Sequence, residues 1–302
     1  AAGSGAVAMV LLSVYDPATG TRKVEVAEPL KGGSGGRPRQ EGIDGTSFTG
    51  GWLRNIPNEV LETDMPVVVE EYGYRPGPAG AGLSRGGAGI RFRLRSLAPE
   101  MLLTARGLER FTFRPWGLAG GTPGSLGKVL LNPGGEGERS LGKLDVLNLE
   151  TGDVVQFDTA SGGGFGDPWR RPPEAVLADV EAGFLTEAEA EDLYAVVVRD
   201  GTVVGDLTKS LRRRERPPRP SFDFGSERLG YETVFSDAVA SEIIRLLQPF
   251  PTRVRPILRS RVRARLQDRA TAPTTSELAA IVDEALAAVG LGRPRELVGA
   301  AR

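Results

Sequence analysis

Residues 159–170, with the sequence Thr-Ala-Ser-Gly-Gly-Gly-Phe-Gly-Asp-Pro-Trp-Arg, place four glycines directly before an aspartate. Glycine adopts positive φ without steric cost, so such a run lets a ligand or another chain approach the backbone closely. Its successive N–H groups can form a concave site for an anion or for the oxygen of a reacting carbonyl. A long turn between a strand and a helix is the alternative interpretation. No Gly-Lys-Ser/Thr follows, so the segment is not a P-loop.

Four carboxylates lie beside glycine-rich or asparagine-rich segments and are candidates for metal binding or acid–base chemistry. They are Asp44, Glu59, Glu62 and Asp167. Hydrogen bonding within loops is the alternative, because the four are far apart in sequence. We take Glu59 and Asp167 as candidate catalytic residues. Pro168 fixes Asp167 next to the glycine run, where it can orient that run or reach a metal on a neighbouring chain.

Two arginines, Arg85 and Arg106, have the planar donor group that binds a carboxylate or phosphate through two parallel hydrogen bonds. A salt bridge that fixes a loop is the alternative for both. Arg85 lies within a glycine cluster and is the third candidate catalytic residue. Ser161 has a hydroxyl nucleophile, but the chain offers no histidine to activate it.

The chain contains neither cysteine nor histidine. Disulfides, a thiolate nucleophile, a Ser-His-Asp triad and nearly every kind of zinc site are therefore excluded, and we expect no metal site in this chain. A net charge of −1 argues against nucleic acid and anionic membranes as partners. The apolar run over residues 6–12 is too short to span a bilayer, so we expect a cytoplasmic protein.

Glycine divides the chain into two parts, since 33 of its 41 glycines lie at or before Gly166. In this first part, apolar runs and alternating patterns predict about eight strands. They cover residues 6–15, 23–28, 67–72, 90–97, 101–104, 128–132, 143–149 and 153–158. Over residues 90–97, arginines alternate with apolar residues, which indicates a half-exposed strand.

Helical patterns replace the strands after residue 168. A helix is expected from Pro173 to Ala182, and a second one begins at a capping box at Thr186. Further helices are expected over residues 232–248, 257–267 and 276–289, with Ser276 capping the last. A hairpin is expected around Asp200-Gly201, and a basic, proline-rich connector over 211–220. The expected fold class is α+β. Its parts are a glycine-rich, mainly β domain (1–168), a segment with helices, the hairpin and the connector (169–220), and a helical C-terminal assembly region (221–302).

Arginine is concentrated between residues 253 and 265, which suggests nucleic-acid binding at first sight. No aromatic residue is interleaved there to stack on bases. Leu258, Val262 and Leu266 recur every four residues and form an apolar stripe. We therefore expect this helix to dock on an acidic protein surface.

Seven motifs in a fixed order resemble the rear half of the hydantoinase B/oxoprolinase family. They are residues 32–37 (Gly-Gly-Ser-Gly-Gly-Arg), 58–62, 85–89, 115–118, 120–124, 161–168 and 173–183. The resemblance covers roughly residues 1–268, since Phe222-Asp223-Phe224-Gly225 and the arginine-rich helices are also similar to family sequence.

The resemblance implies a subunit, or the rear part of a split subunit, of an ATP-dependent multi-subunit enzyme that acts on a carbonyl. Hydrolysis of a cyclic amide, such as a hydantoin, a lactam or 5-oxoproline, is the first expectation. A ketone carboxylase of the acetone or acetophenone type and a non-catalytic scaffold are the alternatives. The resemblance also implies a small-molecule substrate and a hydantoinase A-type partner that binds ATP and Mg²⁺. A zinc or manganese ion would be held by the front half of the B-type subunit or by a partner chain. That front half is expected to be on another chain or to have been lost, and this chain alone would bind no cofactor.

Glycine segments suit close approach of the backbone to an oxyanion. The candidate substrate or oxyanion residues are Gly162, Gly163, Gly164, Gly166, Gly35, Gly36 and Arg37. We expect the run at 161–167 to lie at a shared active site. On that view, Gly163→Val would abolish turnover and leave stability nearly unchanged.

Overall fold

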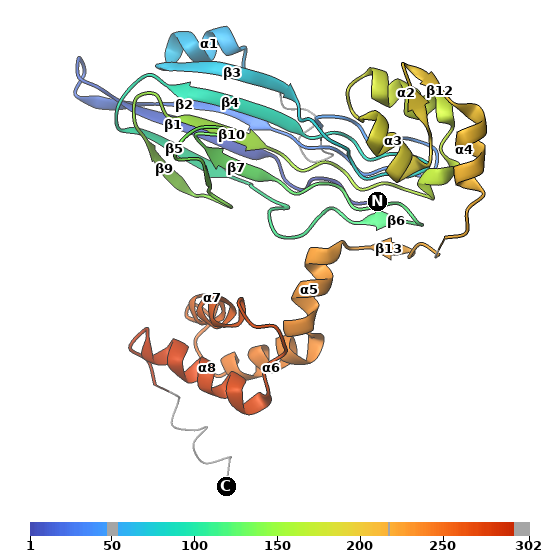
Figure 1. The fold of residues 1–302 in the computed structure, drawn as a ribbon. Coiled ribbons are helices and arrows are strands. Elements are labelled where there is room, and N and C mark those ends of the chain that lie inside the picture. The colour runs from blue at the N-terminus through green and yellow to red at the C-terminus, as the bar shows by residue number, and fades with distance from the viewer. Residues whose placement is uncertain (47–53, 217, 293–302) are drawn as a thin grey trace. The chain divides into compact units, whose positions relative to one another are not determined.

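The computed structural model describes residues 1–46, 54–216 and 218–292. The chain divides into two compact units, Ala1–Gly225 and Ser226–Arg302, which we describe separately (Figure 1). Strands are concentrated in the N-terminal part and helices in the C-terminal part. The α+β fold class predicted from the sequence is therefore confirmed.

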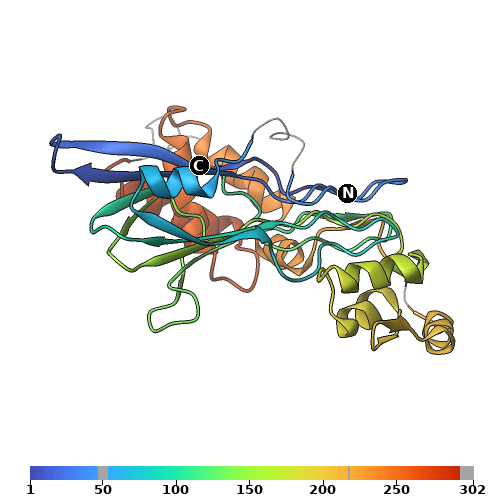
Figure 2. The ribbon, with the colours of Figure 1, turned by 90° about the horizontal axis from the view of Figure 1, so that it is seen from above.

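A two-layer β-sandwich forms one end of the first unit (Figure 2). One sheet has the strand order β2-β1-β5-β9, built from Thr21–Leu30, Ala8–Asp16, Met101–Arg106 and Val146–Leu149. The other has the order β3-β4-β10-β7-β8, built from Val67–Tyr74, Ile90–Ser96, Val154–Asp158, Lys128–Leu131 and Arg139–Ser140. The strand pairs in both sheets are antiparallel.

Alternating side chains from both sheets fill the space between them. Leu12, Leu103, Phe92, Phe157 and Val129 are each at most 1% exposed and belong to one apolar cluster. Helix α1 (Asn58–Asp64) adds Leu61 to the same cluster. All eight predicted strands are present, because an apolar residue at every second position is what a strand with one buried face requires.

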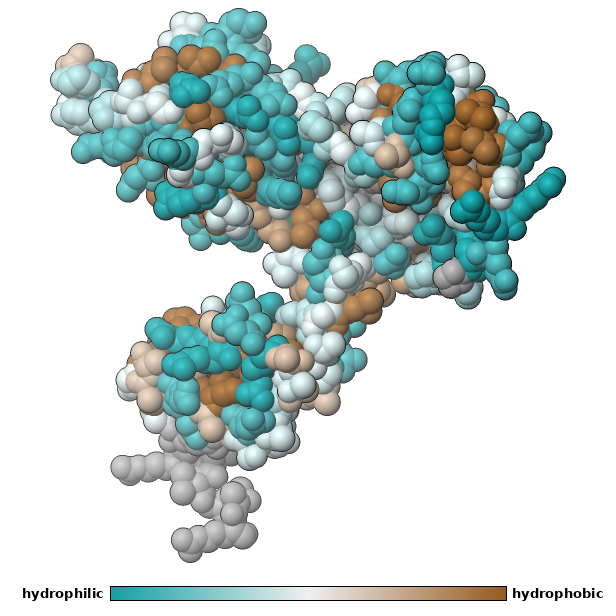
Figure 3. All heavy atoms as spheres, in the orientation of Figure 1, coloured by the Kyte–Doolittle hydropathy of each residue, from teal (hydrophilic) through white to brown (hydrophobic). Residues whose placement is uncertain are grey.

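Arginines cover the outer face of the five-stranded sheet, as the alternation over 90–97 predicts. Arg91 pairs with Asp158 on β10 at 2.7 Å, and Arg93 with Glu71 on β3 at 3.3 Å. This ladder of opposite charges gives the sheet a polar outer surface. In Figure 3 the sandwich presents mainly hydrophilic atoms to the viewer, and apolar atoms gather over α4 (Gly205–Arg212), where Leu207 is 53% exposed.

Five extended segments leave the sandwich side by side and form what we call the glycine bundle (Figures 1 and 2). They are residues 1–5, 32–36, 80–89, 115–124 and 159–166. Ala160–Gly166 is the central segment, and its backbone groups bond to all four of the others. Only two short strands occur in the bundle region: β6 (Gly117–Leu118) pairs with β13 (Phe222–Asp223).

Hydrogen bonds of the central segment repeat every three residues. The N–H groups of Gly162 and Phe165 both donate to the 80–89 segment, at 2.8 and 2.9 Å. The carbonyls of Ala160 and Gly163 both accept from the 32–36 segment, at 3.0 and 2.9 Å. A helix with three residues per turn, as in polyproline II and collagen, presents its backbone groups in this way.

Glycine is required in the bundle because neighbouring backbones touch. A Cβ at any of the following positions would lie within 3.0 Å of a backbone atom of another segment: Gly33, Gly35, Gly36, Gly80, Gly86, Gly121, Gly162, Gly163 and Gly164. Real Cβ atoms essentially never come that close. As in collagen, only a residue without a side chain fits at such an axis.

A helical module lies at the other end of the bundle (Figure 2). It contains η2 (Pro168–Arg170), α2 (Pro173–Glu181), α3 (Glu187–Tyr194), α4 and the hairpin β11–β12 (Val198–Arg199, Thr202–Val203). The predicted capping box is present, since Thr186 accepts from the N–H of Glu189 and the Glu189 carboxylate accepts from that of Thr186. The start of the predicted connector is helical, because α4 continues to Arg212.

The second unit is a helical cluster with its own core. It contains α5 (Ser226–Val234), α6 (Asp237–Leu247), α7 (Arg255–Leu266) and α8 (Thr275–Ala287). The single helix expected over 232–248 is wrong, because Ser236 adopts an extended backbone and caps α6 through the N–H of Val239. Thr274, rather than Ser276, caps α8.

The apolar stripe of α7 is covered within the second unit. Leu258, Val262 and Leu266 are fully buried in the cluster that α6 and α8 complete. The expectation that this stripe needs another protein is therefore wrong. Arg259 and Arg261 remain exposed on the other side of α7, and an assembly role for this unit stays a prediction.

We predict that Gly163→Ala lowers the free energy of unfolding by roughly 1–3 kcal/mol, because the new Cβ would overlap the carbonyl of Trp116. This replaces the expectation that Gly163 tolerates a side chain. Gly135→Ala is the control, since its Cβ would have its nearest neighbour at 3.7 Å. Urea unfolding followed by circular dichroism measures both. Equal stabilities of the two variants would contradict the packing explanation.

Candidate functional site

The glycine run proposed to contact a substrate is the central segment of the bundle. The N–H groups of Gly162, Gly163 and Gly164 donate to backbone carbonyls at 2.8, 2.9 and 2.9 Å, and that of Gly166 donates to Leu118 at 2.9 Å. These groups therefore face neighbouring carbonyls, not a hollow that an anion could enter. Close packing accounts for the glycines, and contact of this segment with a substrate stays a prediction.

The earlier candidates Gly35, Gly36 and Arg37 lie beside the central segment. Gly36 donates its N–H to the carbonyl of Gly163 at 2.9 Å. Arg37 begins a tight turn in which its N–H and that of Gln40 bond each other's carbonyls. Its side chain is exposed, so among these three residues only Arg37 offers a functional group to solvent.

Asp167 lies where the central segment ends and η2 begins. Its carboxylate accepts a hydrogen bond from the N–H of Trp169 at 3.0 Å and a pair of bonds from the guanidinium of Arg216, one of them at 2.8 Å. Arg216 in turn stacks on the Trp169 ring at 4.3 Å. Burial raises the pKa of Asp167, but the bonds from Arg216 and Trp169 outweigh it and hold the pKa below its ordinary value of 3.8. Such a carboxylate anchors the following segment and is a poor proton acceptor near neutral pH.

A surface hollow of about 420 Å³ adjoins Asp167. Its lining residues are Ala119, Gly120, Asp167, Arg216, Pro218, Arg219 and Ser221. The volume falls in the range that small-molecule sites occupy, and two guanidinium groups and one carboxylate face it. Asp167, a candidate catalytic residue from the sequence, is one of the residues that line this hollow.

Arg85 belongs to a buried ionic cluster that joins the bundle to the helical module. Its guanidinium binds both oxygens of Asp44, at 2.7 and 3.0 Å, and its Nε donates to Asp179 of α2 at 3.0 Å. Arg171 donates to the other oxygen of Asp179 at 2.8 Å and also pairs with Glu41. Burial lowers the pKa of Arg85, but the hydrogen bonds that it donates to Asp44 and the charge of Asp179 reverse that shift and raise it.

Arg85 donates four hydrogen bonds to groups within this chain, and the Phe184 ring lies 4.7 Å from its guanidinium carbon. The salt-bridge alternative for Arg85 therefore describes its contacts in this structure. A catalytic role for Arg85 stays a prediction.

Sequence reasoning missed Asp179 and Arg171, which complete the cluster. Asp179 carries a usable signal, since it lies three residues after Val176 on the buried face of an amphipathic helix. A charged residue on such a face needs a buried partner of opposite charge. Arg171 precedes the first prolines of α2 and gives no comparable signal.

The candidate catalytic residues do not come together. Glu59 is exposed in the first turn of α1, on the sandwich, whereas Asp167 and Arg85 lie at the helical module, at the other end of the first unit (Figures 1 and 2). Glu62 accepts the N–H of Val69 at 2.7 Å and fixes α1 to β3. For Glu62 and Asp44, the loop hydrogen-bonding alternative matches the contacts observed.

Arg106 and Ser161 also have local partners. Arg106 forms an exposed salt bridge with Asp145. The Ser161 hydroxyl is buried and accepts from the N–H and the hydroxyl of Ser125, at 2.7 and 2.9 Å. Both side chains therefore hold neighbouring segments in place.

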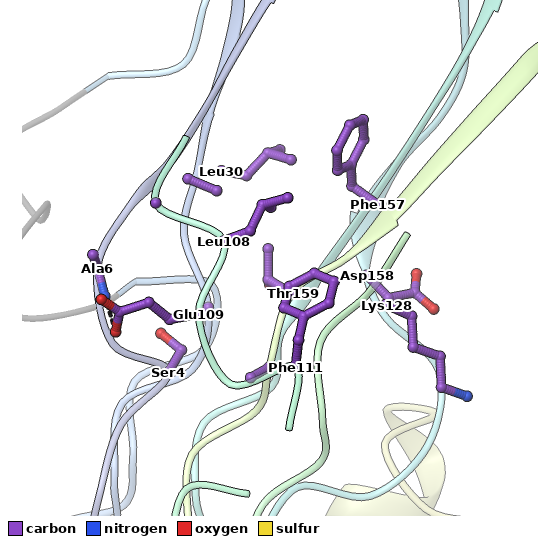
Figure 4. A pocket seen from close by; sticks show the side chains of 14 residues that line it. Ser4, Ala6, Leu30, Leu108, Glu109, Phe111, Lys128, Phe157, Asp158 and Thr159 are labelled. Atoms are coloured by element: carbon purple, nitrogen blue, oxygen red, sulfur yellow. Dashed lines mark hydrogen bonds between the residues drawn. The ribbon is translucent and has the colours of Figure 1, made fainter. Parts of the chain in front are cut away.

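A small cavity lies where the sandwich meets the bundle (Figure 4). Its volume is about 20 Å³, enough for one water molecule. The side chains of Ser4, Glu109, Asp158 and Thr159 surround it, and the Ser4 hydroxyl, although buried, lacks a hydrogen-bond partner. The cavity suits a bound water and is too small for a substrate.

The described carboxylates do not fit a metal centre, since no three of them converge within residues 1–46, 54–216 and 218–292. Over the same ranges, no helix is both long enough and apolar enough to cross a bilayer.

We predict that Asp179→Ala lowers the free energy of unfolding by about 3–5 kcal/mol, because it leaves two buried guanidinium groups with fewer counter-charges. The side chains of Arg171 and Arg85 are only 3% and 10% exposed. Glu191→Ala is the control, since Glu191 pairs with Arg199 at an exposed site and should cost at most about 1 kcal/mol. Urea unfolding measures both, and a small loss for Asp179→Ala would mean that the cluster does not hold the module.

The Asp167–Arg216 pair predicts a specific dependence of stability on pH. Because folding lowers the pKa of Asp167, its contribution is present above pH 3.8 and is lost as the pH falls through the lower folded pKa. Thermal unfolding of wild type and Asp167→Asn should therefore differ most at neutral pH and converge at the acid end. Arg216→Gln should abolish the same pH-dependent difference. A difference that stays constant from neutral pH to below pH 3 would rule out the ion pair as its source.

Comparison with known proteins gives a family match over the whole glycine-rich part. Residues 1–168 match the model of the hydantoinase B/oxoprolinase family. The caprolactamase subunit beta of Pseudomonas jessenii is 32% identical over 173 residues, which are 52% of this chain and 27% of that protein. The chain spans less than a third of the length of the curated relatives that it matches first, at 28% and 31%.

Two solved structures share the fold. An ATP-dependent caprolactamase from Pseudomonas jessenii matches 70% of this chain and 38% of its own, with a TM-score of 0.56 and 24% identity. A nucleotide-free acetone carboxylase matches 91% of this chain and 42% of its own, with a TM-score of 0.58 and 18% identity. Because the family match covers 168 of the 302 residues, this chain belongs to the hydantoinase B/oxoprolinase family.

Proposed function

We propose that this chain is the rear part of a B-type subunit in an ATP-dependent complex that hydrolyses a cyclic amide. The family match over residues 1–168 carries the proposal, and the relation to a caprolactamase beta subunit favours the hydrolytic branch. The chain covers 27% of that subunit, and the proposed function therefore includes parts of the enzyme that this chain does not contain.

In the proposed reaction, ATP on a hydantoinase A-type subunit phosphorylates the carbonyl oxygen of the amide. Water then adds to the carbonyl carbon, and the ring C–N bond breaks as the departing nitrogen takes up a proton. A second water hydrolyses the resulting acyl phosphate, which releases phosphate and the free carboxylate. Zinc or manganese would be held by the front half of the B-type subunit. The described carboxylates of this chain do not form such a centre by themselves.

A scaffold role is the second candidate, and one observation favours it. The N–H groups of the central glycines are already bonded to backbone carbonyls, and Arg85 and Asp167 are held in ion pairs. Under this alternative, the chain supports an active site formed by its partners. Ketone carboxylation is the third candidate, which the acetone carboxylase fold brings into consideration.

Reconstitution tests these candidates. The complex, containing this chain, the front-half chain and the A-type subunit, is supplied with ATP and with hydantoin, 5-oxoproline or caprolactam. We expect phosphate release coupled to ring opening, and no turnover by the isolated chain. Incorporation of labelled bicarbonate into acetone or acetophenone would instead establish the carboxylase. Turnover by the pure 302-residue chain would overturn the subunit proposal.

Variants of the assembled complex separate a catalytic role from a scaffold role. Arg37→Ala changes the one exposed side chain among the candidate loop residues. Lys128→Ala, at an exposed position on β7, is the control. A loss of turnover with Arg37→Ala alone, at equal assembly, supports contact with the substrate. If turnover is unchanged in both variants, the segment that contains Arg37 has a scaffold role.

A further inference from the structure

The outer face of the four-stranded sheet is unusually apolar. Its outward positions are fixed by the register, in which Leu11 pairs with Val26 and Thr104, and Thr104 pairs with Val146. We define the apolar sheet face as Met9, Leu11, Val24, Val26, Leu102 and Val146. Ser13, Thr104 and Asn148 lie between these residues, and no carboxylate is among the outward positions in the rows through Leu11 and Ser13. At the edge of the face, Met9 pairs with Arg106, which forms a salt bridge with Asp145.

This face is accessible in the chain described here. Val24 is 56% exposed and Val146 is 59% exposed, and Met9, Leu11, Val26 and Leu102 are partly exposed. None of the six belongs to the sandwich core or packs against it. An antiparallel sheet with one face on the core normally turns a polar face to water, so a contiguous apolar outer face marks an interaction surface.

The other sheet provides an internal comparison. Its outer positions carry the ladder of Arg91, Arg93 and Arg95 with their acidic or amide partners on β3 and β10. Two faces of one sandwich thus differ in chemistry, although both are built on the same core. The polar ladder suits water, and the apolar sheet face suits a protein surface that is itself apolar and lacks unpaired charge.

The relatives indicate what covers it. They are more than three times as long as the region that this chain matches, at 28%, 31% and 27% coverage. Most of the sequence of these relatives therefore lies outside the region that this chain matches. We propose that the apolar sheet face is the docking surface for the front half of the B-type subunit. This inference rests on the proposed function, in which that half is a separate chain.

The occupant covers β1 and β5, at the centre of the face, because Leu11 and Leu102 lie diagonally across these paired strands. It presents an apolar surface there, since a charge opposite Leu11 or Leu102 would lose its hydration without a counter-charge. A second copy of this chain and the chain's own helical unit, Ser226–Arg302, are competing occupants.

Footprinting of the native complex tests the proposal. The complex is purified through a tag on this chain, and its other chains are identified by mass spectrometry. Hydroxyl-radical oxidation is then compared between the complex and the free chain. We expect protection of Met9, Leu11 and Leu102 in the complex, and none at Val68, which is 40% exposed on the polar sheet.

Matched variants provide the second measurement. Leu11→Lys with Leu102→Lys keeps the strands and adds charge to the apolar sheet face. Val68→Lys with Leu130→Lys does the same on the polar sheet and is the control. We expect at least about tenfold weaker binding of the front-half chain for the first pair and no more than about a twofold change for the control.

The outcomes separate this inference from the proposed function. A complex that forms with the front-half chain, but with Met9 and Leu102 unprotected or with wild-type affinity for the lysine pair, overturns the docking surface alone. A native complex that contains no front-half chain overturns both. Dimers of the free chain that the lysine pair dissociates, or protection that depends on residues 226–302, assign the face to a competing occupant and also overturn the proposal.

Discussion

Direct contact between backbones, with no side chain between them, is the constraint on which the first unit depends. Glycine in an extended segment loses more conformational entropy on folding than any other residue. Here the loss is offset because the central segment bonds to four neighbours, so its buried peptide groups find partners without a sheet. A side chain at Gly33 or Gly162 would separate two segments and expose several such groups at once.

Two sets of ionic contacts join the bundle to other segments of the first unit. The Arg85 cluster fastens α2 to the 80–89 segment, and the Asp167–Arg216 pair fastens the segment before β13 to the end of the central segment. In the Arg85 cluster and in the Asp167–Arg216 pair, the charged partners are all residues of this chain. Arg85 and Asp167, which sequence reasoning selected for chemistry, therefore have structural partners here, whereas Glu59 and Arg37 are exposed.

Much of the fold follows from local patterns. The strands are readable because one face of each is buried, and the cap at Thr186 because its side chain bonds to an N–H group three residues ahead. The sequence predicts the cap of α8 two residues too late, at Ser276 instead of Thr274. The sequence predicts one helix over 232–248 because the apolar spacing continues across Ser236. In the structure, the extended backbone of Ser236 and its capping bond end one helix and begin the next. These are contacts within a few residues, which a sequence displays directly.

The glycine bundle could not be predicted in the same way. Each close approach joins segments far apart in sequence, such as Gly33 with Gly87 and Gly163 with Trp116. A glycine needed for such a contact looks the same in sequence as one that admits a ligand. Asp179 and Arg171 pose the same problem, because their partners in the 80–89 segment are distant in the chain.

The three-residue repeat of the central segment also limits how this region can change in evolution. Inserting one residue before Gly162 would turn the rest of the segment by a third of a turn. The side chain of Phe165 would then be placed at a position that a glycine now occupies beside another segment, where there is little space for it. Length variation in the central segment should therefore occur in steps of three residues, matched in the neighbouring segments, whereas the hairpin loops of the sandwich are free to vary one residue at a time.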